Sequence, residues 1–64
     1  MRFYIVDEHV SDSDRVVIGY YHYHTFAWQE FQKSPDRRLI ALELIDEMKY
    51  EPVHIWEHEL EEVQ

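Results

Sequence analysis

Histidine is the residue type that most readily suggests chemistry in this chain, because its 64 residues include five histidines and no cysteine. His54-Ile55-Trp56-Glu57-His58 has the H-x-x-E-H spacing of inverted zinc peptidases. That chemistry needs both histidines on one helical face, a glutamate base between them and a third ligand further on. The segment instead follows a proline and is typical of a strand, and few residues remain after it. We therefore assign no zinc peptidase.

A second histidine pair could hold a divalent metal. His22 and His24 share one face of a strand, since side chains alternate with a period of two, and Asp7 is a candidate third ligand. The alternative is that Tyr20 to His24 form an amphipathic aromatic strip for packing or for an interface. We favour that interpretation and expect no cofactor and no catalytic residue. With Gly19 as its single glycine, the chain also lacks a phosphate-binding loop.

The charge balance is strongly acidic, with 14 Asp and Glu against six Lys and Arg and a net charge of −8. Proteins bind nucleic acid through Lys and Arg, so we expect no direct nucleic-acid contact. From Glu51 onward the chain has five glutamates and no basic residue. This run is either a solvated, solubilising surface or a docking surface for a basic partner.

Periodicity and turn residues predict a small α+β domain over residues 1–64. Strands are expected at Arg2–Val10 and Arg15–Thr25, joined by an acidic turn. Phe26–Lys33 allows one or two helical turns. Ser34-Pro35-Asp36 has the form of a helix N-terminus and predicts the main helix over Pro35–Lys49. Val53–Leu60 is a strand or a helix, and we favour a strand with a short helix at Glu59–Gln64. The expected architecture is β-β-α-β, a single layer of sheet with the helix packed on one face.

Two leucines do not fit the apolar stripe of that expected helix. Leu39 and Leu42 fall on its charged flank. They are either isolated surface residues or a contact with a second subunit or another protein. A chain this short buries only about 60 % of the surface that its unfolded form exposes, and association often adds the missing stability. We therefore expect a homodimer.

From Gly19 onward three pieces of the chain resemble the C-terminal half of very-short-patch-repair endonucleases, in the PD-(D/E)xK superfamily. They are Tyr21-His22-Tyr23-His24, Asp36-Arg37-Arg38 and Pro52–Leu60. The resemblance implies a strand leading to an aromatic-histidine pair, a helix, and a strand ending in Trp-Glu. The family's metal-binding aspartate has no counterpart at Ile18-Gly19-Tyr20, and only Asp7 could substitute. The resemblance therefore supports the fold more than a nuclease activity.

Ten aromatic residues and 45 % apolar residues indicate a folded chain. No apolar run could cross a membrane, and the early acid at Asp7 does not suit a secretory signal, so we expect a cytoplasmic protein.

These observations favour a small acidic, non-enzymatic protein-binding module. We expect an inhibitor from a phage or mobile element that docks on a basic, nucleic-acid-handling host protein, by DNA mimicry. The expected interaction residues are Tyr20, Tyr21, Tyr23, Trp28, Leu39, Leu42, Trp56, Glu57, Glu59, Glu61 and Glu62. The alternative is a minimal or decayed metal-dependent nuclease of the very-short-patch-repair type.

Overall fold

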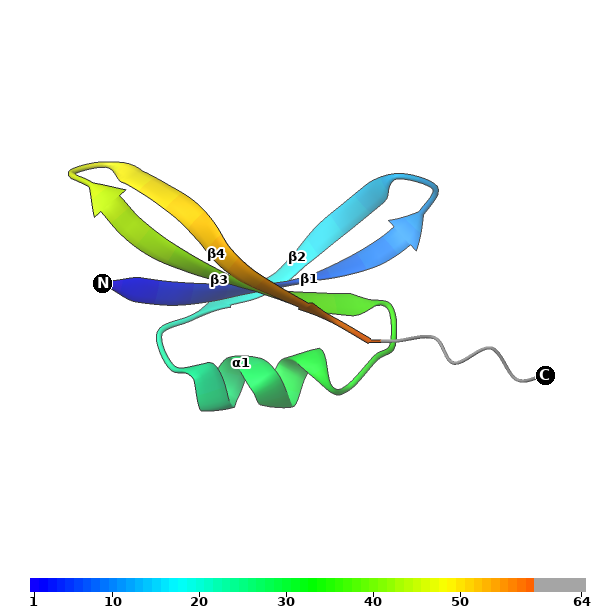
Figure 1. Ribbon diagram of the computed structural model, residues 1–64. Helices are drawn as coiled ribbons and strands as arrows, with labels where there is room; N and C mark the ends of the chain where they lie inside the picture. Colours follow the sequence, from blue (N-terminus) through cyan, green and yellow to red (C-terminus); the bar gives the residue numbers. More distant parts are fainter. Residues whose placement is uncertain (59–64) are drawn as a thin grey trace.

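The protein is dominated by one antiparallel sheet. The computed structural model describes residues 1–58. Four strands pair in the spatial order β2-β1-β3-β4, every neighbouring pair is antiparallel, and one short helix follows β2 (Figure 1). The elements in chain order are β1 (Arg2–Ser11), β2 (Asp14–Tyr21), α1 (His24–Phe31), β3 (Arg37–Asp46) and β4 (Lys49–Glu57).

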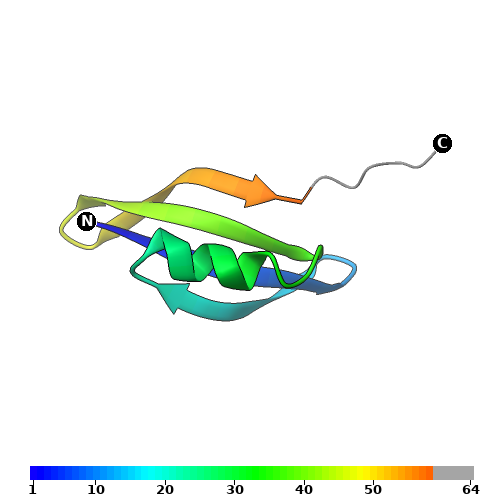
Figure 2. The same ribbon diagram turned by 90° about the horizontal axis from the view of Figure 1, so that it is seen from below.

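The helix α1 joins two hairpins across one face of the sheet. β2 is an edge strand and β3 is a central strand, with β1 between them, so the chain must cross β1 to continue. Figures 1 and 2 show α1 making this crossing on one side of the sheet, while the tips of both hairpins point to the other side. One face of the sheet is therefore covered by the helix. The opposite face is covered by no element among the described residues.

The core lies between α1 and the covered face. Val6 of β1 and Leu39 of β3 are fully buried, and they pack against Ala27 and Phe31 of the helix. Val6 and Leu39 are register partners, so they stand side by side on the same face of the sheet. Complete burial of each such side chain contributes about 1.5–3 kcal/mol. This small cluster fixes α1 on the sheet.

The expected β-β-α-β architecture is wrong, because the segment predicted as the main helix is a strand. Residues 37–46 form β3, which pairs with β1 on one side and β4 on the other. The middle of β3, Leu39–Leu42, is apolar on both faces, and a continuous apolar run does not distinguish a strand from a helix. Residues 37–46 form a strand rather than a helix because β1 and β4 pair with both of its edges.

The helix-start signal at Ser34 is instead a turn. The Ser34 hydroxyl accepts a hydrogen bond from the Asp36 backbone N–H at 3.3 Å, and the Ser34 carbonyl accepts one from the Arg37 N–H at 3.3 Å. Serine favours such local bonds in turns as well as at helix caps. The same residues that suggested an N-cap therefore turn the chain from α1 into β3.

The other expected elements are displaced by a few residues. The first strand is confirmed and extends to Ser11, while the second ends at Tyr21 rather than at Thr25. The short helix begins earlier than expected, at His24. The last segment is a strand, as we favoured, although β4 begins before Pro52. The short helix expected at Glu59–Gln64 lies outside the described residues.

Candidate protein-binding surface

The uncovered side of the sheet carries a row of apolar side chains. Because Val6 and Leu39 point toward α1, their neighbours Ile5 and Ile40 point away from it. Ile5 pairs with Ile40, and Ile40 pairs with Ile55 of β4, so three isoleucines cross the sheet in register. We call this side the open face. It is lined by the apolar and aromatic side chains of Phe3, Ile5, Tyr20, Ile40, Leu42, Tyr50 and Ile55 and, by the same alternation, by the ion-paired Asp7 and Arg38.

The open face is more exposed at its edges than at its centre. Ile5 and Ile40, on the central strands, are half-buried, whereas Tyr20 on β2 and Ile55 on β4 are exposed. Phe3 and Tyr50 meet edge to face with ring centroids 4.6 Å apart. This geometry is favourable for aromatic rings and holds one end of the surface in place.

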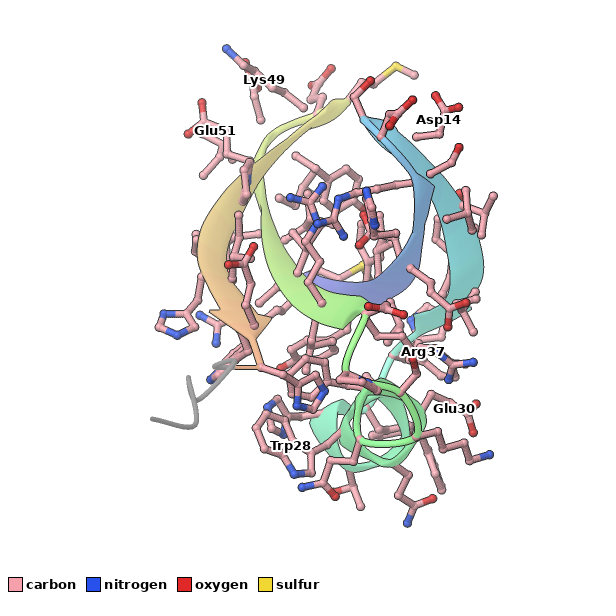
Figure 3. All side chains as sticks on the ribbon, turned by 90° about the vertical axis from the view of Figure 1, so that its right-hand side faces the viewer. Asp14, Trp28, Glu30, Arg37, Lys49 and Glu51 are labelled. Carbon is pink, nitrogen blue, oxygen red and sulfur yellow. The ribbon has the colours of Figure 1, made fainter. Side chains whose placement is uncertain are left out.

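Both hairpin tips beside the open face are acidic. The β1–β2 turn carries Asp12 and Asp14, and the β3–β4 turn carries Asp46 and Glu47. Asp12 has φ 44, in the left-handed region that Asp tolerates better than most residues. In Figure 3, Asp14 and Glu51 lie at the end of the molecule away from the helix, which carries Trp28 and Glu30. Negative charge therefore flanks the apolar surface.

Every lysine and arginine of the chain makes an ion pair with a neighbouring acid. The six pairs are Arg2–Glu43, Arg15–Asp7, Lys33–Glu30, Arg37–Glu8, Arg38–Asp7 and Lys49–Glu51. Among the described residues, the turn acids Asp12, Asp46 and Glu47 have no ion-pair partner. The internal pairing thus leaves an excess of negative charge at both tips.

Two of these pairs shift the carboxyl pKa. The Arg2 guanidinium donates a hydrogen bond to Glu43 at 2.8 Å, and this bond holds the pKa of Glu43 below its ordinary value. The Lys33 ammonium donates a hydrogen bond to the Glu30 carboxylate at 2.7 Å, and this bond lowers the pKa of Glu30 in the same way. Both carboxylates are therefore stabilised in the charged form.

Asp7 is the most enclosed charged group, with 7 % of its surface exposed. It accepts hydrogen bonds from Arg38 Nε at 2.9 and 3.1 Å and from Arg15 Nη1 at 3.2 Å. Asp7 and Arg38 are register partners, so the sheet itself sets this contact. The carboxylate is taken up by two guanidinium groups, and residues 1–58 contain no group of three potential metal ligands.

The pocket next to this network combines both signs of charge. It is lined by His9, Arg15, Pro35, Asp36, Arg37, Arg38, Glu57 and His58. Arg37 is bound on two sides, by Glu8 Oε1 at 2.8 Å and by the Glu30 carbonyl at 2.6 Å. The His58 ring bonds the Phe31 carbonyl at 2.8 Å. These contacts tie the turn before β3 to the sheet and to the end of α1.

The histidines singled out above do not come together. His24 is the first residue of α1, and its ring stacks on Trp28 at 5.5 Å and meets Trp56 at 5.2 Å. His22 follows the end of β2, so the shared strand face expected for His22 and His24 does not form. His54 and His58 are four residues apart along extended chain, or about 13 Å, too far to share a metal ion.

The expected interaction residues divide into three groups. Tyr20 and Tyr23 are 67 % exposed and remain available, and Glu57 is exposed on β4. Leu42 is half-buried on the open face. Tyr21, Trp28 and Trp56 pack against the core, and Leu39 is fully buried, so Leu39 cannot contact a partner of the folded chain. Glu59, Glu61 and Glu62 lie outside the described residues.

Sequence reasoning missed the isoleucine row. Ile40 falls within the helix predicted over Pro35–Lys49, and no local pattern singles out Ile5 or Ile55. The alternating apolar residues on both faces of the first strand were the available signal, since Phe3 and Ile5 share one face while Tyr4 and Val6 share the other. Such a strand needs cover on two sides, and the chain supplies one helix.

No protein-family model, curated protein or solved structure matches this chain. The resemblance to very-short-patch-repair endonucleases therefore stays a prediction. Within residues 1–58, no helix is long and apolar enough to cross a membrane.

Proposed function

We propose that this chain is a small, non-enzymatic protein-binding module of the cytoplasm that docks on a basic partner through the open face. The supporting observation is the combination of an uncovered apolar sheet face with acidic turns on both sides of it. Exposed contiguous apolar surface with a polar rim is typical of a protein interaction site. Tyr20 and Ile55 supply apolar contact area at its margins.

The charge determines which kind of partner suits this surface. Each Lys and Arg is already held by a neighbouring acid, so the chain offers a partner unpaired carboxylates and no unpaired cation within the described residues. Complementary charge speeds encounter and excludes acidic partners. The segment that fits is therefore apolar at its centre and rich in Lys or Arg at its ends.

A nucleic-acid-handling protein is the class of partner that we infer. Such proteins concentrate Lys and Arg where they bind phosphates. An acidic module seated on that surface would occupy the place of DNA and inhibit the partner, as an inhibitor from a phage or mobile element would. The nuclease alternative gains no support from the described residues, because both guanidinium groups beside Asp7 compete with a metal for its carboxylate.

Calorimetric titration with three synthetic peptides tests the proposal. The first is an amphipathic helix of Lys and Leu, the second replaces Lys by Glu, and the third replaces Leu by Ser. We expect the Lys–Leu peptide alone to bind, and its affinity to fall with added salt. Ile55→Thr should weaken binding, while Phe26→Gln, an exposed apolar residue of α1, should not.

Two results would overturn the proposal. Equal binding of the Glu–Leu and Lys–Leu peptides would show that charge does not select the partner. An unchanged affinity in Ile55→Thr, or an equal loss in Phe26→Gln, would show that the open face is not the docking surface. Circular dichroism of each variant confirms that the comparison is between folded proteins.

A further inference from the structure

The outer edge of β2 is an unpaired sheet edge with exposed apolar side chains. β2 pairs with β1 on one side only, so alternate backbone N–H and C=O groups along its other side have no strand partner among the described residues. Val16, Val17 and Tyr20 on this strand are all exposed. The strand is rich in β-branched and aromatic residues, which suit further strand pairing.

The same stretch of chain is free of acidic residues. From Arg15 to Gln29 there are fifteen residues without an Asp or Glu, although the whole chain has 14 acids and a net charge of −8. Like-charge repulsion opposes the approach of two copies everywhere else on such a surface. Two copies repel each other least along this segment. A second copy of the chain is therefore the partner that can approach it most easily.

We propose that two copies of this chain pair through their β2 edges, antiparallel across a two-fold axis, to form one continuous eight-stranded sheet. This proposal does not rest on the basic partner above. The dimer uses the edge of the sheet, and the part of the open face on the other three strands stays available.

The β-bulge in β2 sets the position of the axis. Val6 pairs with Gly19 and Asp7 with Val17, so Ile18 is the extra residue. Ile18 and Gly19 share the face toward the helix, so an axis between them places Val17 of one copy opposite Tyr20 of the other, and Val16 opposite Tyr21, with each pair on one face of the sheet. Arg15 keeps its ion pair with Asp7 in this arrangement.

The acids at the ends of this pairing remain far apart. Asp14 stands four and a half residues from the axis, so the two Asp14 residues are about 30 Å apart at about 3.3 Å per residue. The screening length at physiological salt is about 8 Å, and the repulsion between them is therefore small.

The other edge strand is poorly suited to the same pairing. Pro52 has no N–H to donate, and β4 carries Glu51 and Glu57. Two copies that approach through their β4 edges bring four of these carboxylates to one shared edge, where like charges repel. The two edges therefore differ, and β2 is the one that pairs.

Sedimentation equilibrium from micromolar to millimolar concentration tests the dimer. We expect a mass of twice the 8.0 kDa of the chain at high concentration, with association that strengthens as salt is added, because salt screens the net repulsion. This sign is opposite to that expected for the basic peptides, so the two proposals can fail separately. A monomer throughout this range, or a dimer weakened by salt, would overturn the proposal.

A matched pair of substitutions locates the interface. Val17→Lys removes the contact with the partner copy's Tyr20, places like charges about 11 Å apart across the axis, and should weaken association about tenfold. Val53→Lys changes the net charge equally on β4, where Val53 is exposed to nearly the same extent as Val17, and should leave association unchanged. Equal effects of the two substitutions would contradict pairing through β2.

Mixing provides a readout that misfolding cannot imitate. Val17→Lys and Val17→Glu should each be mainly monomeric and should form a heterodimer when combined, because the opposite charges then face each other across the axis. Circular dichroism establishes that each is folded alone. Two folded variants that stay monomeric after mixing would refute the assigned strand edge.

Discussion

Replacement of Asp7 by Asn tests whether the enclosed carboxylate holds the sheet together. Asp7 accepts bonds from Arg38 of β3 and Arg15 of β2, so one side chain of β1 links three strands. Asp7→Asn keeps the shape, removes the charge and leaves two guanidinium groups facing each other. We expect the free energy of unfolding to fall.

The size of the loss follows from the burial of the three groups. Removal of one partner of a fully buried ion pair costs about 3–5 kcal/mol. The side chains of Arg15 and Arg38 are 32 % and 29 % exposed, so water replaces part of the lost interaction, and we expect about 2 kcal/mol. The total stability of a chain of this length is about 3–10 kcal/mol. The loss is therefore a large share of it and should lower the Tm by about 10 °C.

Urea denaturation followed by tryptophan fluorescence measures this change, because Trp28 and Trp56 both pack against the core. The matched control is Glu57→Gln. Glu57 is an exposed acid directly opposite Arg38 in the register, and it makes no ion pair within the described residues. We expect less than about 0.5 kcal/mol for it. If Asp7→Asn were as stable as the parent chain, or more stable, the structural role assigned to Asp7 would be refuted.

Three further substitutions test the core, the bulge and the ion pairs. Leu39→Ala should cost about 2–5 kcal/mol in urea denaturation, because the side chain is fully buried; a loss below about 1 kcal/mol would mean that Leu39 does not lie in the core. Gly19→Ala places a Cβ 2.6 Å from the Tyr21 hydroxyl and should cost about 1 kcal/mol, and thermal denaturation showing a gain would contradict this packing. Glu43→Gln should flatten the acid side of the stability profile. The pKa of Glu43 is lowered in the folded state by Arg2, so its contribution is present above the ordinary glutamate pKa of about 4.3 and is lost as the pH falls through the lowered value. An unchanged difference between parent and variant from pH 6 to pH 3 would contradict the ion pair.

The local patterns located the first hairpin but not the second. Ser11-Asp12-Ser13-Asp14 is a strong turn signal between two β-rich segments, and β1 and β2 pair there. The turn at Glu47-Met48 lacks Gly, Asn and Pro, so nothing marked it as a hairpin. Residues 37–46 also include three Leu, two Arg, one Ala and one Glu, all of which favour helices in isolation. Strand β3 exists because β1 and β4 supply partners that a local pattern does not contain.

The lack of long-range information in a local pattern also limits the prediction of interaction residues. Residue type alone selects Tyr20, Tyr21 and Tyr23, of which Tyr20 and Tyr23 are exposed while Tyr21 packs against the core. The tryptophans could not be assigned by that rule, because Trp28 and Trp56 face each other across the contact between α1 and β4. Whether an aromatic side chain faces a core or a partner depends on which strand lies beside it. That information came only with the sheet order.

Pro52 has a consequence for how far such a molecule can assemble. A sheet with two equally receptive borders can add copies without end, and it forms fibres. Here the β4 edge is protected from pairing by Pro52, which has no N–H, and by the carboxylates of Glu51 and Glu57. In the dimer that we propose, growth through the remaining border would use up that border in both copies at once, so the assembly would close at two and an acidic chain rich in tyrosine and valine would be protected from open-ended sheet growth.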